Sequence, residues 1–137
     1  MALHPTLARD TVEVARLPLC RLLLMNDRRF PWLILVPERE DAREIHELPP
    51  ADRAALVEEI ARVGEAMERL FQPDKLNVGA LGNIVPQLHV HVVARFAADP
   101  AWPGPVWGFG AAVPYEASEL AAIRERLAAA FREPIQV

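Results

Sequence analysis

The apolar positions of the chain follow strand-like spacing at first. Val12 and Val14 alternate with polar residues over 11–18, which predicts a strand. The apolar runs at 20–27 and 32–37 are short and are closed by turn-forming residues or by proline, which predicts two more strands. Three short strands in succession favour an antiparallel meander.

The stretch after Pro49 and Pro50 has helical spacing instead. Its apolar residues recur at steps of four and three, as on one face of a helix: Leu56, Ile60, Val63, Met67 and Leu70. Prolines are tolerated in a first helical turn, and the charged residues, Glu59 among them, lie largely off the apolar stripe. The polar segment 38–48 before the helix is predicted to be a loop with some local helix.

Two further strands and a second helix complete the pattern. Residues 75–83 and 87–96 are predicted strands, and residues 99–114, rich in proline and glycine, are a predicted irregular arm. A helix follows from about Tyr115, with one apolar face formed by Leu120, Ile123, Leu127 and Phe131. The order of strands, long helix, strands and final helix predicts an α+β fold with an antiparallel sheet of about five strands.

Composition narrows the classes of function. The chain has 137 residues, of which 52% are hydrophobic, and this suits a single domain over 1–137 with a loose N-terminus at 1–10 and a C-terminal arm and helix at 99–137. The net charge of −4 and the lack of a basic stripe argue against nucleic acid as a partner, although a small phosphorylated ligand needs far less charge. The lone Cys20 fits a reducing compartment. Because no segment reaches the roughly 18 to 20 apolar residues that span a bilayer, we expect a cytoplasmic protein with no membrane partner.

Candidate chemistry lies in the predicted strand at 87–96. Residues two apart on a strand point the same way, so Gln87, His89, His91 and Val93 share one face. The opposite face carries Leu88, Val90 and Val92. The strand therefore presents a polar row that is backed by apolar core.

Three interpretations of the histidine pair are open. The rings can be partly buried and held by hydrogen bonds alone. They can be a metal-ligand pair, although a stable zinc site usually needs a third protein ligand, which only His4, His46 or a distant carboxylate could supply. They can also do chemistry, one ring as nucleophile and the other as hydrogen-bond donor, since an unperturbed imidazole with a pKa of about 6.5 is mostly neutral at pH 7.

The flanking residues favour chemistry. The stretch 77–93, NVGALGNIVPQLHVHVV, resembles the histidine triad (HIT) family, whose motif is three histidines separated by single apolar residues after a glycine-rich turn. His89 and His91 match the second and third histidines, and Gln87 stands in place of the first. The residues that match the family's preceding strand and turn are Asn77 and Gly82. The resemblance implies an HIT-like fold.

The resemblance also implies a function. HIT proteins are nucleotide-binding hydrolases and transferases that act at the α-phosphorus through a nucleotidyl-imidazole intermediate. It implies that His89 is the nucleophile, that His91 donates a hydrogen bond to a phosphate oxygen, and that Gln87 orients them. The implied substrate-binding residues are Asn77, Gly82, Asn83, Ile84 and Val85 for the phosphate, and Asn26 and Asp27 near the ribose. No metal or other cofactor is required by this scheme.

Three positions depart from the family pattern. Gln87 cannot be charged or relay a proton as histidine does, but it can donate and accept hydrogen bonds. Asn83 stands where many members have glutamine, and Ile84 where many have a hydroxyl near the leaving group. The leading hypothesis is a hydrolase of nucleoside phosphoramidates, adenylated compounds or dinucleoside polyphosphates. The alternatives are a regulatory nucleotide-binding protein with little catalysis and a metal-binding protein. The expected partners are a small nucleotide and a second copy of the chain, because family members commonly dimerise by joining sheets.

Overall fold

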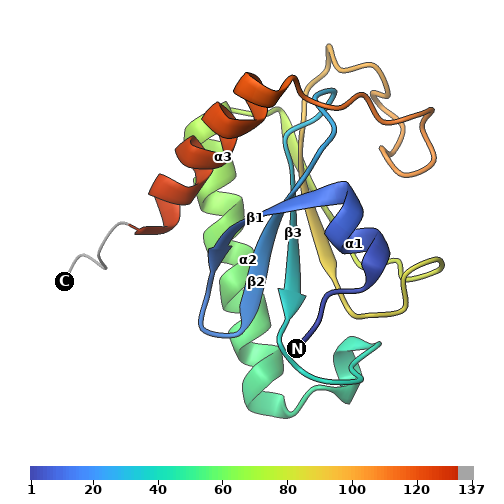
Figure 1. Ribbon diagram of the computed structural model, residues 1–137, viewed down its shortest axis with the longest axis vertical. Helices are drawn as coiled ribbons and strands as arrows, with labels where there is room; N and C mark the ends of the chain where they lie inside the picture. The colour runs from blue at the N-terminus through green and yellow to red at the C-terminus, as the bar shows by residue number, and fades with distance from the viewer. Residues whose placement is uncertain (133–137) are drawn as a thin grey trace.

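The structure is a computed structural model that describes residues 1–132, and it has one five-stranded antiparallel sheet (Figure 1). The strands are β1 (Thr11–Arg16), β2 (Cys20–Met25), β3 (Trp32–Pro37), β4 (Lys75–Gly79) and β5 (Val90–Arg95). Their order across the sheet is β1-β2-β3-β5-β4, with every neighbouring pair antiparallel. The helical elements are α1 (Pro5–Asp10), the 3-10 turn η1 (Ile45–Glu47), α2 (Pro50–Phe71) and α3 (Ala117–Arg132). The predicted α+β class, the meander and the two helices are confirmed.

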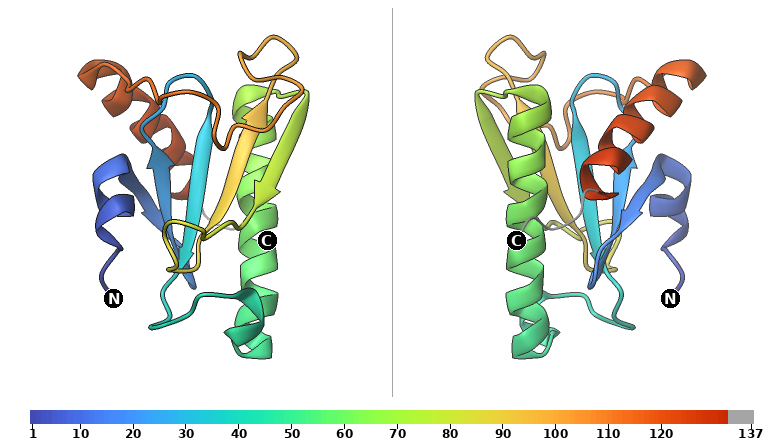
Figure 2. Two further views of the ribbon diagram at one scale, coloured as in Figure 1. Left: turned by 90° about the vertical axis from the view of Figure 1, so that its right-hand side faces the viewer. Right: turned by 90° about the vertical axis from the view of Figure 1, so that its left-hand side faces the viewer.

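One face of the sheet packs against α2 and α3, and the right-hand view of Figure 2 shows both helices in front of it. The helical stripe predicted on α2 lies in this core, with Leu56, Val63 and Met67 fully buried. Val90 and Val92 of β5, and Leu88 just before it, are buried in the same core. Their burial leaves the alternate residues of that segment for the other face.

The second face of the sheet is covered by α1 and by the arm at 99–114. Leu7 of α1 and Val106 of the arm are buried there with Trp32 and Val93 of the sheet. This face carries the histidines. The helix α1 and the arm, which are far apart in the sequence, therefore both lie near them.

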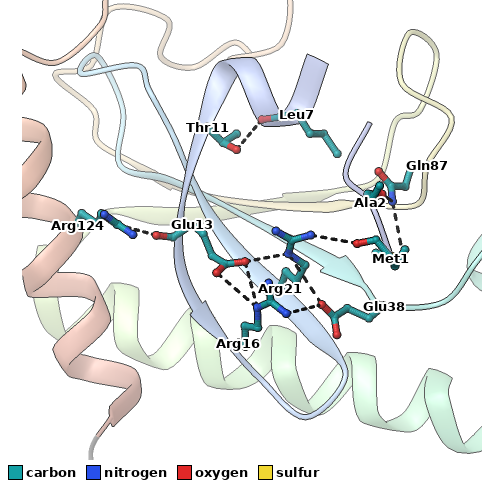
Figure 3. A network of polar contacts seen from close by, with 10 residues as sticks. All are labelled: Met1, Ala2, Leu7, Thr11, Glu13, Arg16, Arg21, Glu38, Gln87 and Arg124. Atoms are coloured by element: carbon teal, nitrogen blue, oxygen red, sulfur yellow. Dashed lines mark hydrogen bonds and ion pairs between the residues drawn. The ribbon is translucent and has the colours of Figure 1, made fainter. Parts of the chain in front are cut away.

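The predicted loose N-terminus is wrong, because residues 5–10 form α1. Pro5 occupies the first turn, and the His4 ring accepts the backbone N–H of Thr6 as a cap. The helix ends where the Thr11 hydroxyl donates to the Leu7 carbonyl, as Figure 3 shows. A six-residue helix with a histidine cap is too short to show a helical periodicity in the sequence. The burial of Leu7 stabilises this helix through tertiary contacts.

Two local features also differ from the expected pattern. The last strand begins at Val90, three residues later than predicted, so His89 precedes the ladder. Glu59 lies in the core because its carboxylate accepts the backbone N–H groups of Leu19 and Cys20 at 2.8 and 2.9 Å. The last part of the expected C-terminal helix, residues 133–137, lies outside the described residues. Within 1–132, none of the helices combines the length and the apolar character that a bilayer crossing needs.

Candidate active site

The two histidines lie side by side on the face of the sheet covered by α1 and the arm. His91 pairs with Ile34 of β3 and Gly79 of β4, so it sits in the middle of three strands. His89 comes just before β5, and the centroids of the two rings are 4.9 Å apart in an edge-to-face arrangement. Both side chains are largely buried, at 7% and 6% exposure. The predicted common face of His89 and His91 agrees with this placement.

The hydrogen bond of His89 defines which of its ring nitrogens is free. Its Nδ1 lies 2.7 Å from the backbone carbonyl oxygen of Gln87. A carbonyl oxygen only accepts, so this bond places the proton on Nδ1. In the neutral ring, Nε2 then keeps its lone pair and can act as a nucleophile.

His91 has the opposite tautomer. The indole Nε1–H of Trp32 donates to Nδ1 of His91 at 2.9 Å, so in the neutral ring the proton is on Nε2. Burial, and secondarily the nearby His89, lower the pKa of His91 from 6.5 to about 4. At neutral pH His91 is therefore an uncharged donor, fixed in orientation by the indole.

Beside the rings lies a cavity of about 470 Å³, which we call the histidine pocket. It is lined by His89 and His91, by Thr6, Leu7 and Asp10 of α1, by Met25, Trp32 and Ile34 of the sheet, by residues 81–85, and by Trp107 and Gly108 of the arm. Sequence reasoning missed the contributions from α1 and from Met25, and it left open whether Trp107 of the arm edges the pocket or packs on a second subunit. Trp32 was predicted only as part of the strand at 32–37. The pattern around these residues signals burial or a loop, and only the tertiary arrangement brings them to the histidines.

The arm is fastened by Arg95, which is 1% exposed. Its guanidinium makes a bidentate pair with Asp99 at 2.8 and 3.1 Å and donates to the Gly104 carbonyl at 2.7 Å. A bidentate pair of this kind fixes geometry as well as adding energy. The arm is thereby held over the sheet, on the same face as the histidine pocket.

Trp107 closes one side of the pocket. Its ring lies 5.4 Å from His91, centroid to centroid, and packs against Gly79, where an added Cβ would come within 3.2 Å of the indole. The absence of a side chain at Gly79 therefore lets the indole approach the strand. Among residues 1–132, the Trp107 Nε1–H is buried without a hydrogen-bond partner, which leaves one unused donor in the pocket wall.

The turn at residues 82–85, which the sequence predicts to contact the phosphate, forms part of the wall of the histidine pocket. Gly82 has a φ of +78°, a conformation that glycine adopts without strain. Gly82, Asn83, Ile84 and Val85 all line the histidine pocket. The Ile84 side chain is 86% exposed, so this position offers an apolar surface at the rim.

The side chain of Gln87 is engaged elsewhere. Its Oε1 accepts the backbone N–H of His4 at 2.7 Å. Its Nε2 donates to the Ala2 carbonyl at 3.1 Å (Figure 3). Arg21 donates to the Met1 carbonyl in the same network. The amide of Gln87 thus anchors the N-terminal segment that leads into α1, while its backbone carbonyl accepts the hydrogen bond from His89.

The other predicted binding residues already have hydrogen bonds within the chain. Asn77 accepts from Arg95 at 2.7 Å, and Asn26 accepts the backbone N–H of Tyr115 at 2.9 Å. Asp27 is 1% exposed and pairs with Arg29 at 2.8 Å. None of the three lines the histidine pocket as described over 1–132.

Within the described part of the chain, no group of three histidine, cysteine, aspartate or glutamate residues is placed to hold a metal ion. Within residues 1–132, His89 and His91 therefore lack a third protein ligand for a metal ion.

Comparison with known proteins identifies the family. The HIT domain model matches residues 7–98. A crystal structure of a histidine triad (HIT) protein from Sinorhizobium meliloti 1021 is 50% identical over 92% of this chain and 93% of that one, with a TM-score of 0.90. A histidine triad protein from Marinobacter aquaeolei VT8 is 47% identical over 94% of each chain, with a TM-score of 0.92. No match was found among curated proteins.

The chain therefore belongs to the HIT domain family. This is a family of nucleotide-binding hydrolases and transferases, and membership implies that the chain binds a nucleotide.

Proposed function

We propose that the protein is a nucleotide hydrolase or nucleotidyl transferase that acts at the α-phosphorus through His89. Its substrates would be nucleoside phosphoramidates, adenylated compounds or dinucleoside polyphosphates. The observation that carries the proposal is the pair of complementary tautomers: Nε2 of His89 has a free lone pair, and Nε2 of His91 carries a proton. One is a nucleophile and the other a neutral donor for a phosphate oxygen, side by side next to a cavity.

The proposed reaction has two displacements. Nε2 of His89 forms a bond to phosphorus while the bond to the leaving group breaks, and the leaving group keeps the electron pair and takes a proton from water. A water molecule, or another acceptor, then attacks phosphorus and gives up a proton as the bond to Nε2 breaks. His91 donates a hydrogen bond to a phosphate oxygen as charge develops there. Two lower barriers thus replace one high barrier.

Gln87 has a positioning role in this proposal. It stands where the motif has its first histidine, and its carbonyl oxygen holds the tautomer of His89. Asn77, Asn26 and Asp27 stay as predicted substrate contacts, and a ligand would have to share or replace their present hydrogen bonds.

A His89→Asn variant tests the proposal. Hydrolysis of adenosine 5′-phosphoramidate should fall at least a hundredfold, while AMP binding measured by calorimetry should persist, because only the nucleophile is removed. Hydrolysis at the wild-type rate in this variant would rule out His89 as the nucleophile.

A second candidate is a nucleotide-binding protein with little catalysis. It is favoured by the exposed Ile84, which supplies no hydroxyl to a leaving group, and by the engagement of Gln87 with the N-terminal segment. Nucleotide affinity without turnover across phosphoramidate, adenylate and polyphosphate substrates would establish this candidate. Turnover that disappears with His89→Asn would exclude it.

We also propose a cytoplasmic homodimer. Strand β4 is an edge strand with Val78 52% exposed, and an open edge of this kind can pair with a second copy. Cys20 is buried and unpaired within the described residues, as suits a reducing compartment. Light scattering tests the assembly: the mass of one chain in solution would contradict the dimer.

A further inference from the structure

A second cavity meets the histidine pocket at His89. It has a volume of about 360 Å³ and shares Leu81, Gly82 and His89 with the pocket. Its own walls come from the segment between β3 and α2 and from the first turns of α2. We call it the basic cavity and define it by Arg43, Glu44, His46, Arg53, Gln87 and His89. His89 is therefore the junction of two spaces.

The two spaces differ in charge. Among residues 1–132, the histidine pocket has no lysine or arginine in its lining, and its one ionisable acid is Asp10. The lining of the basic cavity includes two arginines, Arg43 and Arg53, against one acidic residue, Glu44. An apolar compartment and a cationic compartment thus adjoin the same nucleophile.

Neither arginine is neutralised by a carboxylate within the described residues. Arg53 donates from Nη1 to the backbone carbonyls of Leu48 at 2.8 Å and His46 at 3.4 Å. The Arg43 side chain makes no hydrogen bond or ion pair over residues 1–132, although its backbone N–H donates to Glu47. Guanidinium groups bind carboxylate and phosphate with directed donors, so these groups are available to an anion.

We propose that the basic cavity is a leaving-group subsite that selects substrates whose leaving group carries a carboxylate or a phosphate. The inference rests on the proposed function and narrows its substrate class. The nucleoside lies in the histidine pocket, the reacting phosphorus lies at Nε2 of His89, and the anionic end of the leaving group reaches Arg43 and Arg53. An amino acid or a phosphorylated amine joined to the α-phosphorus through nitrogen has this chemistry. Its P–N bond breaks as the bond to Nε2 forms, and the amine leaves with the electron pair and takes a proton from water.

Three adenosine 5′-phosphoramidates of similar size test the subsite. Their leaving amines are β-alanine with a carboxylate, 2-aminoethyl phosphate with a phosphate, and propylamine with no charge. Attraction to one or two arginines at a partly exposed site should raise kcat/KM for an anionic leaving group about fivefold or more over propylamine. The two anionic arms also show whether carboxylate or phosphate is preferred.

Variants of Arg43 locate the effect, because within residues 1–132 this side chain makes no hydrogen bond or ion pair that the substitution would break. The ratio of kcat/KM between the β-alanine and propylamine substrates should fall toward one in Arg43→Gln, where Arg53 remains, and fall further in Arg43→Glu. The matched control is Arg69→Gln, which removes an equal charge from an exposed position on α2 outside both cavities and should keep the wild-type ratio.

The outcomes separate the two proposals. If the wild-type chain hydrolyses all three substrates at equal kcat/KM, or if Arg69→Gln lowers the ratio as much as Arg43→Gln does, the subsite is refuted while the proposed function stands. If the wild-type chain releases AMP from none of them, the proposed function is refuted and the subsite with it.

Discussion

The environment of His91 makes the stability of the protein depend on pH. Burial and the nearby His89 lower the pKa of His91 from 6.5 to about 4 in the folded chain. Between these two pH values, the unfolded chain binds a proton at this residue and the folded chain does not. Stability rises with pH wherever the unfolded state binds more protons. The free energy of unfolding must therefore decrease as the pH falls from neutrality toward 4.

The size of the effect follows from the same pKa values. Each tenfold change in proton affinity is worth about 1.4 kcal/mol, so the contribution of His91 is about 3 kcal/mol once the pH is below both values. At about pH 5, where the unfolded ring is protonated and the folded ring is still mostly neutral, about 2 kcal/mol is already lost. The side chain is only 6% exposed, so solvent screening reduces this number little.

Urea denaturation of the wild-type chain and of His91→Gln at about pH 7.5 and about pH 5 measures the effect. The wild-type chain should lose about 2 kcal/mol more than the variant between these two conditions. The control His46→Gln removes an exposed imidazole and should lose as much as the wild-type chain. If His91→Gln loses as much as the wild-type chain, the buried neutral state assigned to His91 is refuted.

Three further substitutions test individual contacts. Trp32→Phe removes the donor that fixes His91, and we expect kcat of AMP release to fall roughly tenfold, the worth of one hydrogen bond; an unchanged kcat would show that the indole does not set the tautomer. Gln87→Leu should speed amide hydrogen exchange in the N-terminal segment and raise KM severalfold with kcat within about twofold, since the wall of the pocket loosens; a collapse of kcat with unchanged exchange would instead make the amide part of the chemistry. Glu59→Gln should lower the free energy of unfolding by about 2 kcal/mol because one of two buried N–H groups loses its acceptor, whereas the exposed neighbour variant Glu58→Gln should change it by less than about 0.5 kcal/mol; equal losses would contradict the buried role.

The elements were predictable where one spacing persists over several residues. The alternation around Val90 and Val92, and the stripe on α2, each reflect burial of one face against the core, which the structure confirms. The start of β5 could not be predicted in this way. His89 lies between apolar residues, as the strand residues do, but it pairs with no residue of β3 or β4. The helix α1 was missed because it depends on a histidine cap and on Leu7 packing against the sheet.

The candidate site could be predicted from the sequence only in part, for a related reason. The motif places His89 and His91 together, since residues two apart share a strand face. The bond from Trp32 to His91 joins residues 59 positions apart in the chain, and Trp107 reaches the pocket through an arm fastened by Arg95. Such contacts depend on the register of β3 against β5 and on buried ion pairs, which spacing in a single sequence does not reveal.

The central claim is that the lone pair on Nε2 of His89 attacks phosphorus. Mass spectrometry tests this directly. The protein is quenched during turnover of adenosine 5′-phosphoramidate under conditions that preserve acid-labile P–N bonds. We predict one AMP group on His89 itself, located by fragmentation of the peptide that carries both His89 and His91, and its absence in His89→Asn. The account would be contradicted if the wild-type chain released AMP with no nucleotide attached to it at any time. Attachment of AMP to His91 in place of His89 would also contradict it.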